Sequence, residues 1–278
     1  MNWSLKEFSP ILSHLNFKEL SQRDQKYIMG TQLLDFVVKT ERFEIEYVNT
    51  VSSDISLGKF EFDFSDEIKL DALKIYTDEG YHAFFSRKIA QQIRNYYSID
   101  DSEKFDNCVN PFFEKIDNYI AKYPDKYKHY AKIAIVIISE NTILSDLSDT
   151  MKGVVYEPIR NMFKDHLVDE TFHAKFYTQI LLIIWDKLNY DEKIIMGECL
   201  CDSIELLSLP RLDVFYYAFR KIGFNKSIIS ESLLDIYSSD MLKKRLKSRM
   251  ACFLKIFEYV GALQIKSIEN RLSRMGLS

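Results

Sequence analysis

Glycine and proline are scarce in this chain. Only 8 glycines and 5 prolines occur among its 278 residues, whereas apolar residues make up 47% of the total. Turn-rich sheets need more of both residue types, so a chain that is poor in them favours long helices. We therefore predict an all-α fold.

Long apolar runs and an excess of basic charge are also absent. The net charge of −4 is spread along the chain, without the basic face that a nucleic-acid-binding protein needs. The most apolar runs, 133–138 and 180–185, are much shorter than the roughly 20 residues that span a bilayer. The N-terminal stretch carries charges and Pro10, so it fits neither a secretory signal nor a lipid anchor. We expect a cytoplasmic protein with no nucleic-acid or membrane partner.

The four cysteines show no paired framework. They are Cys108, Cys199, Cys201 and Cys252. Residues 199 and 201 would face opposite sides of a helix, which favours a structural role over a thiolate metal or redox site. Unpaired cysteines also agree with a reducing compartment.

Apolar residues recur with the helical period in four long blocks, which cover about residues 24–56, 65–98, 124–151 and 158–187. Shorter helical stretches follow near 190–207, 210–222, 226–237 and 239–272. Residues 57–64 form a short turn, while 99–123 contains Asn110-Pro111 and either holds a short helix or crosses the bundle. The pattern predicts two pairs of long helices followed by smaller ones.

One six-residue pattern occurs twice on these blocks. Residues 78–83 (DEGYHA) on the second long helix match residues 169–174 (DETFHA) on the fourth. Each repeat contains a Glu and a His three positions apart, and such residues lie on nearly the same face of a helix. Each pair therefore offers a carboxylate and an imidazole to one point. In ferritin-like bundles, two such pairs and one Glu from each of two other helices hold two metal ions.

Two further glutamates are therefore required on otherwise apolar faces. Glu140 has isoleucine, valine and leucine at its helical neighbours, and a lone buried carboxylate costs several kcal/mol unless a cation meets it. On the first helix Glu44 shares its face with apolar residues, whereas Glu46 has polar neighbours. Glu41 lies about 60° from Glu44 around the helix, so it is either the ligand instead or a group beside the site. A kink that exposes Glu140 is the alternative there.

His166 extends the fourth helix's pair into a stripe. It precedes Glu170 by four residues and His173 by seven, so three of the five histidines face one centre. The alternative is a core or surface histidine that bonds to a carbonyl. His14 and His129 fit no such pattern and are interpreted as surface or structural residues.

In chain order the predicted metal ligands are Glu44, Glu79, His82, Glu140, His166, Glu170 and His173. This order resembles the p-aminobenzoate N-oxygenase (AurF-like) family of di-iron enzymes, in which an additional histidine ligand distinguishes the site from that of ferritin. The resemblance covers about residues 30–187. It implies one ferritin-like di-iron domain over 1–278, with a four-helix core at about 24–187 and accessory helices at about 190–272.

The resemblance also implies a reaction. Two iron ions would use O2 to oxidise the amino group of a small metabolite, free or tethered to a carrier protein, to a hydroxylamine, nitroso or nitro group. The di-iron centre itself would be the catalyst, and no side chain is assigned to substrate binding. Electrons would come from an external donor, since the chain has no flavin, nicotinamide or iron–sulfur motif. A homodimer is a further implication.

The residues leave several alternatives open. The ligands alone do not choose between amine oxidation and C–H hydroxylation, desaturation or oxidative cleavage, nor between iron and manganese. Iron storage or ferroxidase activity is a third interpretation. The helices after residue 190 are evidence against it. The basic segment 243–249 is interpreted as a solvated helix face, with docking of an acidic reductase as its alternative.

Other residues of the repeated segments have expected places as well. Asp78 and Asp169 precede the ligand glutamates, and they are candidates to accept hydrogen bonds from ligand histidines, with a surface role as the alternative. Four aromatic residues on the same helices are expected in the core rather than in a pocket. These are Tyr76, Tyr81, Phe172 and Tyr177.

Overall fold

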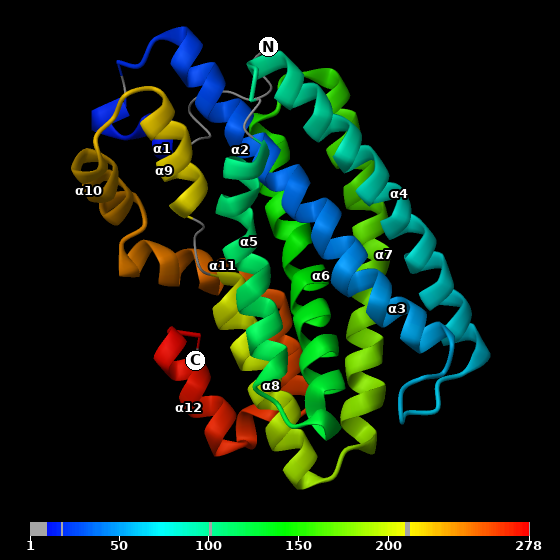
Figure 1. Cartoon of the computed structure of the whole chain (residues 1–278). Helices are drawn as coiled ribbons and strands as arrows, with labels where there is room; N and C mark the ends of the chain where they lie inside the picture. The colour runs from blue at the N-terminus through cyan, green and yellow to red at the C-terminus, as the bar shows by residue number, and fades with distance from the viewer. Residues whose placement is uncertain (1–9, 18, 100–101, 209–211, 278) are drawn as a thin grey trace.

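The computed structural model describes residues 10–17, 19–99, 102–208 and 212–277, and its regular elements there are helices without any strand (Figure 1). The all-α prediction is confirmed. The long helices form a bundle in which α4 packs along α2 and α3, and α6 packs along α7. Their bounds are α2 (Gln22–Phe43), η3 (Glu44–Val48), α3 (Asn49–Ser56), α4 (Asp66–Tyr97), α6 (Lys128–Gly153) and α7 (Glu157–Lys187).

Local sequence explains where these helices begin. The Ser21 side chain accepts a hydrogen bond from the Asp24 backbone N–H, and Ser65 does the same for Ile68 at the start of α4. Each bond satisfies a backbone donor that the first helical turn leaves without a partner. Pro158 lies in the first turn of α7, where its missing N–H costs little.

The connection over 99–123 holds a helix, which is one of its two predicted forms, but the helix is longer than predicted. This helix, α5 (Ser102–Ala121), has 20 residues, with Pro111 inside. Residues at helical spacing are buried along it, among them Phe105, Val109, Phe113 and Ile116. An interior proline costs about 3 kcal/mol, and burial of these four side chains, at about 1.5–3 kcal/mol each, outweighs it.

The C-terminal helices lie mainly on one side of the bundle, and α1 (Pro10–Ser13) joins them there (Figure 1). They are α8 (Tyr190–Ser208), α9 (Leu212–Lys221), α10 (Lys226–Ile236), α11 (Ser239–Tyr259) and α12 (Lys266–Met275), and short 3-10 turns are η2 (Leu15–Phe17), η4 (Asp125–Tyr127) and η5 (Ala262–Gln264). The stretch predicted over 239–272 is thus two helices. They separate at Gly261, whose φ of 72° is a left-handed conformation that favours glycine.

Helix α8 packs between α6 and α12, so both of its cysteines, Cys199 and Cys201, are buried although they face opposite sides. Burial raises the pKa of both thiols, to about 11 and about 12. Asp202 on α8 forms ion pairs with Lys122, which follows α5, and with Arg271 of α12. Among the described residues, no helix is long and apolar enough to cross a bilayer.

Candidate metal centre

All seven predicted ligands lie together and are buried at the centre of the bundle. They form two groups that could each hold a metal ion, and in each group one ligand atom per residue lies within 4.8 Å of the others. The first group is Glu44, His82, His166 and Glu170, and the second is Glu79, Glu140, Glu170 and His173. Glu170 belongs to both groups, so its two oxygens are placed to bridge them.

Glu44 begins a π-helical turn, η3, between α2 and α3. Such a turn places one extra residue in the helix, and it occurs often at functional sites. Helix α5 holds this turn from outside: the Tyr47 hydroxyl donates to Asp117 at 2.8 Å, and Arg42 donates to Asn110 at 2.8 Å. The local geometry thus places Glu44 within the bundle.

Two aspartates orient two of the histidines. Asp169 on α7 accepts a hydrogen bond from Nε2 of His82 on α4 at 3.1 Å, and Asp78 on α4 accepts one from Nε2 of His173 on α7 at 3.2 Å. Because each Nε2 donates to an aspartate, each Nδ1 is the ring nitrogen that faces the centre and could bind a metal ion. Nδ1 of His82 lies 3.2 Å from Glu79, and Nδ1 of His173 lies 3.0 Å from the same carboxylate.

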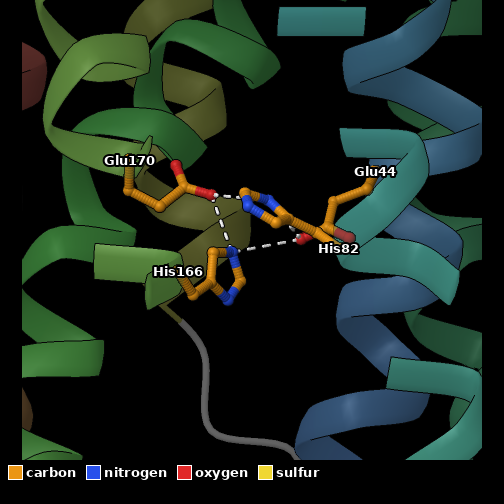
Figure 2. Close-up of side chains that lie close together, drawn as sticks. All are labelled: Glu44, His82, His166 and Glu170. Carbon is orange, nitrogen blue, oxygen red and sulfur yellow. Dashed lines mark hydrogen bonds and ion pairs between the residues drawn. The ribbon is translucent and has the colours of Figure 1, made fainter. Parts of the chain in front are cut away.

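His166 is arranged differently, as Figure 2 shows. Its Nε2 faces the centre, 2.8 Å from Oε1 of Glu170 and 3.3 Å from Oε1 of Glu44. Its Nδ1 is buried and has no hydrogen-bond partner. Thus the first group contains one histidine that is oriented by a carboxylate and one that is not.

Burial dominates the electrostatics of the cluster. It raises the pKa of Glu44 and Glu140 well above the usual range, and neighbouring carboxylates add to the effect. Burial also opposes ionisation of Glu170, but close contacts with His166 and His173 hold its pKa below the usual range. For His173, burial opposes protonation, and contacts with Glu140, Glu170 and Glu79 raise its pKa. The buried carboxylates therefore need a positive charge beside them in order to be ionised.

The cluster fits two divalent ions. Several buried ligand atoms have no hydrogen-bond partner, including both oxygens of Glu44, Oε2 of Glu140 and Nδ1 of His173. Leaving such atoms unsatisfied costs about 1–3 kcal/mol each, and more when they are charged. The four carboxylates carry four negative charges when ionised, which two divalent cations would balance. Mixed imidazole and carboxylate ligands suit first-row transition metals.

Other residues considered from the sequence lie outside both groups. Glu41 pairs with Arg87 across to α4, with its Oε1 2.7 Å from the arginine Nε. His14 bonds to Asp235, and His129 to Glu61, both at 3.0 Å. The last two contacts agree with the surface or structural role expected of these histidines.

The expectation that four aromatic residues lie in the core is half wrong. Tyr177 is buried, but Tyr76 and Tyr81 are 45% and 63% exposed, and Phe172 is half-buried. Helix α4 is the outer edge of the bundle in Figure 1, and its outward face carries apolar residues.

In the basic segment 243–249, Arg249 turns inward and pairs with Asp146 at 2.5 Å, so the segment does not form one continuous basic face.

Sequence reasoning missed the contacts that support the site from a distance. Ser52 on α3 and Tyr177 on α7 share a buried hydrogen bond of 2.7 Å, although they are 125 residues apart. The contacts of Arg42 and Tyr47 with α5 are of the same kind. No local signal reveals such pairs, because each depends on how distant helices pack.

The fold and the buried groups define a class, namely helical-bundle proteins whose carboxylates and histidines fit a two-metal site. The family model described as "P-aminobenzoate N-oxygenase AurF" matches residues 1–257. The chain therefore belongs to the AurF family, and the resemblance noted in the sequence is confirmed. A search among curated proteins finds no match to the chain.

Proposed function

We propose that this protein is a non-haem di-iron N-oxygenase that uses O2 to oxidise the amino group of a small metabolite. The observation that carries the proposal is the pair of buried groups, which share Glu170 and in which several carboxylate oxygens lack a hydrogen-bond partner. Membership of the AurF family supports the choice of nitrogen over carbon as the atom oxidised. Two irons held by the seven residues would supply activation of O2.

The chain's own residues would bind and orient the ions. Asp78 and Asp169 fix the proton on Nε2 of His173 and His82, which keeps the opposite nitrogen available as a ligand. Glu170 would contribute to holding both ions, since it belongs to both groups. The burial of all seven ligands excludes bulk water, which protects an oxidising centre from side reactions.

A cavity of about 50 Å³ leads to Glu44, Glu140 and Glu170 between α2, α5 and α6. The cavity is far smaller than the roughly 300–1,000 Å³ of a typical ligand pocket, so a bound amine would require the side chains that line it to move. Arg249 and Asp146, which pair with each other, line it as well. We propose that the amine enters here and that this ion pair moves aside.

Electrons and partners complete the proposal. An external reductase or other electron donor would reduce the irons, since the chain carries no motif for a redox cofactor of its own. The substrate would be a small amine, free or tethered to a carrier protein, and the protein would act as a homodimer.

We further propose a single domain over 1–278, because Tyr27 packs against both hydrophobic clusters of the described residues.

Metal content per chain is the first test. Protein purified with iron available, or reconstituted anaerobically with Fe(II), should contain about two irons per chain. Glu140→Ala and His166→Ala should lower this content, whereas Glu46→Ala and His129→Ala should not, because neither Glu46 nor His129 belongs to either ligand group. A folded parent that binds no metal after reconstitution would refute the di-iron assignment.

The reaction has its own test. Loaded protein would be incubated with O2, a chemical reductant and a panel of amines, and products would be identified by mass spectrometry. Hydroxylamine, nitroso or nitro products are expected with the parent and not with Glu140→Ala. Hydroxylation at carbon without any oxidised nitrogen would contradict the N-oxygenase proposal and leave the metal site intact.

A further inference from the structure

An apolar stripe runs along the outer face of α4, away from the metal ligands. Leu70, Leu73, Tyr81 and Phe84 are 67%, 51%, 63% and 55% exposed. Together with Thr77, which lies at the centre, they follow one another at intervals of three or four residues, so they lie on one face of the helix. Contiguous exposed apolar residues on one helix face mark an interaction surface.

The stripe extends beyond α4. Nζ of Lys74 on α4 lies 4.7 Å from the centroid of the Phe172 ring. Phe172, which belongs to α7, therefore borders the stripe. Val168, one turn before Phe172, is 66% exposed. Helix α4 is about 48 Å long for its 32 residues. With the adjoining α7 residues, we expect this face to be able to bury the roughly 800 Å² per partner of a standard interface.

The stripe is self-complementary when read in opposite directions. Reversal about Thr77 places Leu70 opposite Phe84 and Leu73 opposite Tyr81, since the members of each pair are equally far from residue 77. Thr77 then faces its own copy. A two-fold interface requires this property, because the same patch must fit itself.

The charges that flank the stripe follow the same symmetry. The acidic residues Asp66 and Glu67 lie 11 and 10 residues before Thr77, and the basic residues Lys88 and Arg87 lie 11 and 10 residues after it. All four are exposed, and Arg87 also pairs with Glu41 of its own chain. An antiparallel copy would therefore set acidic ends against basic ends. Such charge pairs add little affinity at the rim, but they select orientation and register.

We propose that a second copy of this chain docks on the α4 stripe, antiparallel, with the two-fold axis at Thr77. A crossing angle of about 20°, which is common between long bundle helices, keeps the charged ends within reach of each other. This inference does not depend on the reaction or on the metal. It assigns a contact surface to the homodimer, and it explains why apolar residues occur on the exposed side of an edge helix.

The first experiment measures the mass of the full-length protein by analytical ultracentrifugation. The parent should be a dimer. Phe84→Glu sets a carboxylate against the partner's Leu70 at both symmetric positions, so the dimer dissociation constant should rise at least about 100-fold. Leu234→Glu on α10 is the matched control, since Leu234 is 73% exposed and lies outside the stripe, and it should leave the dimer unchanged. Circular dichroism checks that both variants fold.

A crosslink then tests the register. Helices packed about 8–10 Å apart, with Cα atoms about 2.3 Å from each axis, bring the two copies of residue 77 to about 4–5 Å between Cα atoms. This separation suits a disulfide. Thr77→Cys, in a chain with Cys108→Ser and Cys252→Ser, should therefore oxidise to a covalent dimer. Gln91→Cys in the same background lies 14 residues from the axis and should not.

Charge exchange completes the test. Asp66→Lys and Lys88→Asp should each weaken the dimer through like-charge contacts, and the two together should restore it, which damage to the fold would not do. A dimer that resists Phe84→Glu and does not crosslink at residue 77 would overturn the proposal. So would a monomeric parent, whether or not its α4 face binds lipid vesicles or another protein.

Discussion

The two ligand groups of the centre differ although a sequence repeat builds both. Each group takes a histidine from one repeat and shares the carboxylate of Glu170. The first group adds Glu44 and His166, which gives it two carboxylates and two histidines. The second adds Glu79 and Glu140, which gives it three carboxylates and one histidine. Carboxylates stabilise higher metal charge, so the two positions are chemically unequal.

The backbone and the hydrogen bonds that hold the ligand residues also differ between the two groups. Glu44 lies on a π-helical turn, and Nδ1 of His166 has no hydrogen-bond partner. Glu140 lies within α6 among buried isoleucine and valine residues, and Asp78 orients His173. We infer that the second group is the rigid, high-affinity position, and that the first is the position whose ligands can rearrange during the reaction.

The largest expected effect comes from the residue that the groups share. Glu170→Gln keeps the volume of the side chain but removes the carboxylate that both groups share, so iron content should fall from about two per chain to about zero. Addition of Fe(II) should raise the melting temperature of the parent, since a ligand at 1,000 times its Kd stabilises the folded state by about 4.1 kcal/mol. The variant should show no such rise. Retention of two irons would show that Glu170 does not join the groups.

Separate loss of each ion is the next effect in size. Glu140→Gln should lower the affinity of the second position and Glu44→Gln that of the first, so each variant should retain about one iron per chain. Anaerobic Fe(II) titration followed by calorimetry would distinguish the two binding steps. Glu46→Gln is a control on the same turn as Glu44, and it should bind as the parent does. If both ligand variants lost the same binding step, the two-position description would be wrong.

Five of the seven clustered residues rest on strong local rules in the sequence, whereas Glu44 and His166 each had an alternative. Two E-x-x-H pairs at helical spacing and a carboxylate among isoleucines, Glu140, leave few arrangements that avoid a buried unpaired charge. The rule for apolar residues is weaker. Tyr81 on the α4 stripe was expected in the core, yet it is exposed, because periodicity shows that a face is apolar and not what covers it.

The errors in the fold have physical causes as well. Asn110-Pro111 favoured a short helix or a crossing segment over 99–123, but burial along α5 compensates for the hydrogen bond that a proline removes, and the helix is 20 residues long. The π turn at Glu44 was not predicted, because its backbone hydrogen bonds shift without any characteristic residue. The contact of Tyr47 with Asp117 joins segments 70 residues apart, and only the packed structure reveals it.

A smaller effect should come from the aspartates behind the histidines. Asp169→Asn weakens the orientation of His82 and so acts on the first position, whereas Asp78→Asn acts on His173 and the second. Loss of such a partner typically lowers metal affinity 10- to 100-fold. Calorimetric titration should therefore show one weakened step in each variant, and a different one. Equal weakening of both steps by either variant would argue that the aspartates support the bundle as a whole.

The smallest effect tests whether α5 helps to hold the first group. Tyr47→Phe removes the hydroxyl that donates to Asp117 and leaves the ring in place. A hydrogen bond of this kind contributes about 0.5–1.5 kcal/mol, so the first Fe(II) position should weaken by no more than about tenfold and the second should not change. Tyr130→Phe is the matched control, because its hydroxyl also donates to a carboxylate, Glu61, but not one on α5. If both variants bind iron as the parent does, the π turn holds Glu44 in place without help from α5, and the difference between the two groups lies in their ligands alone.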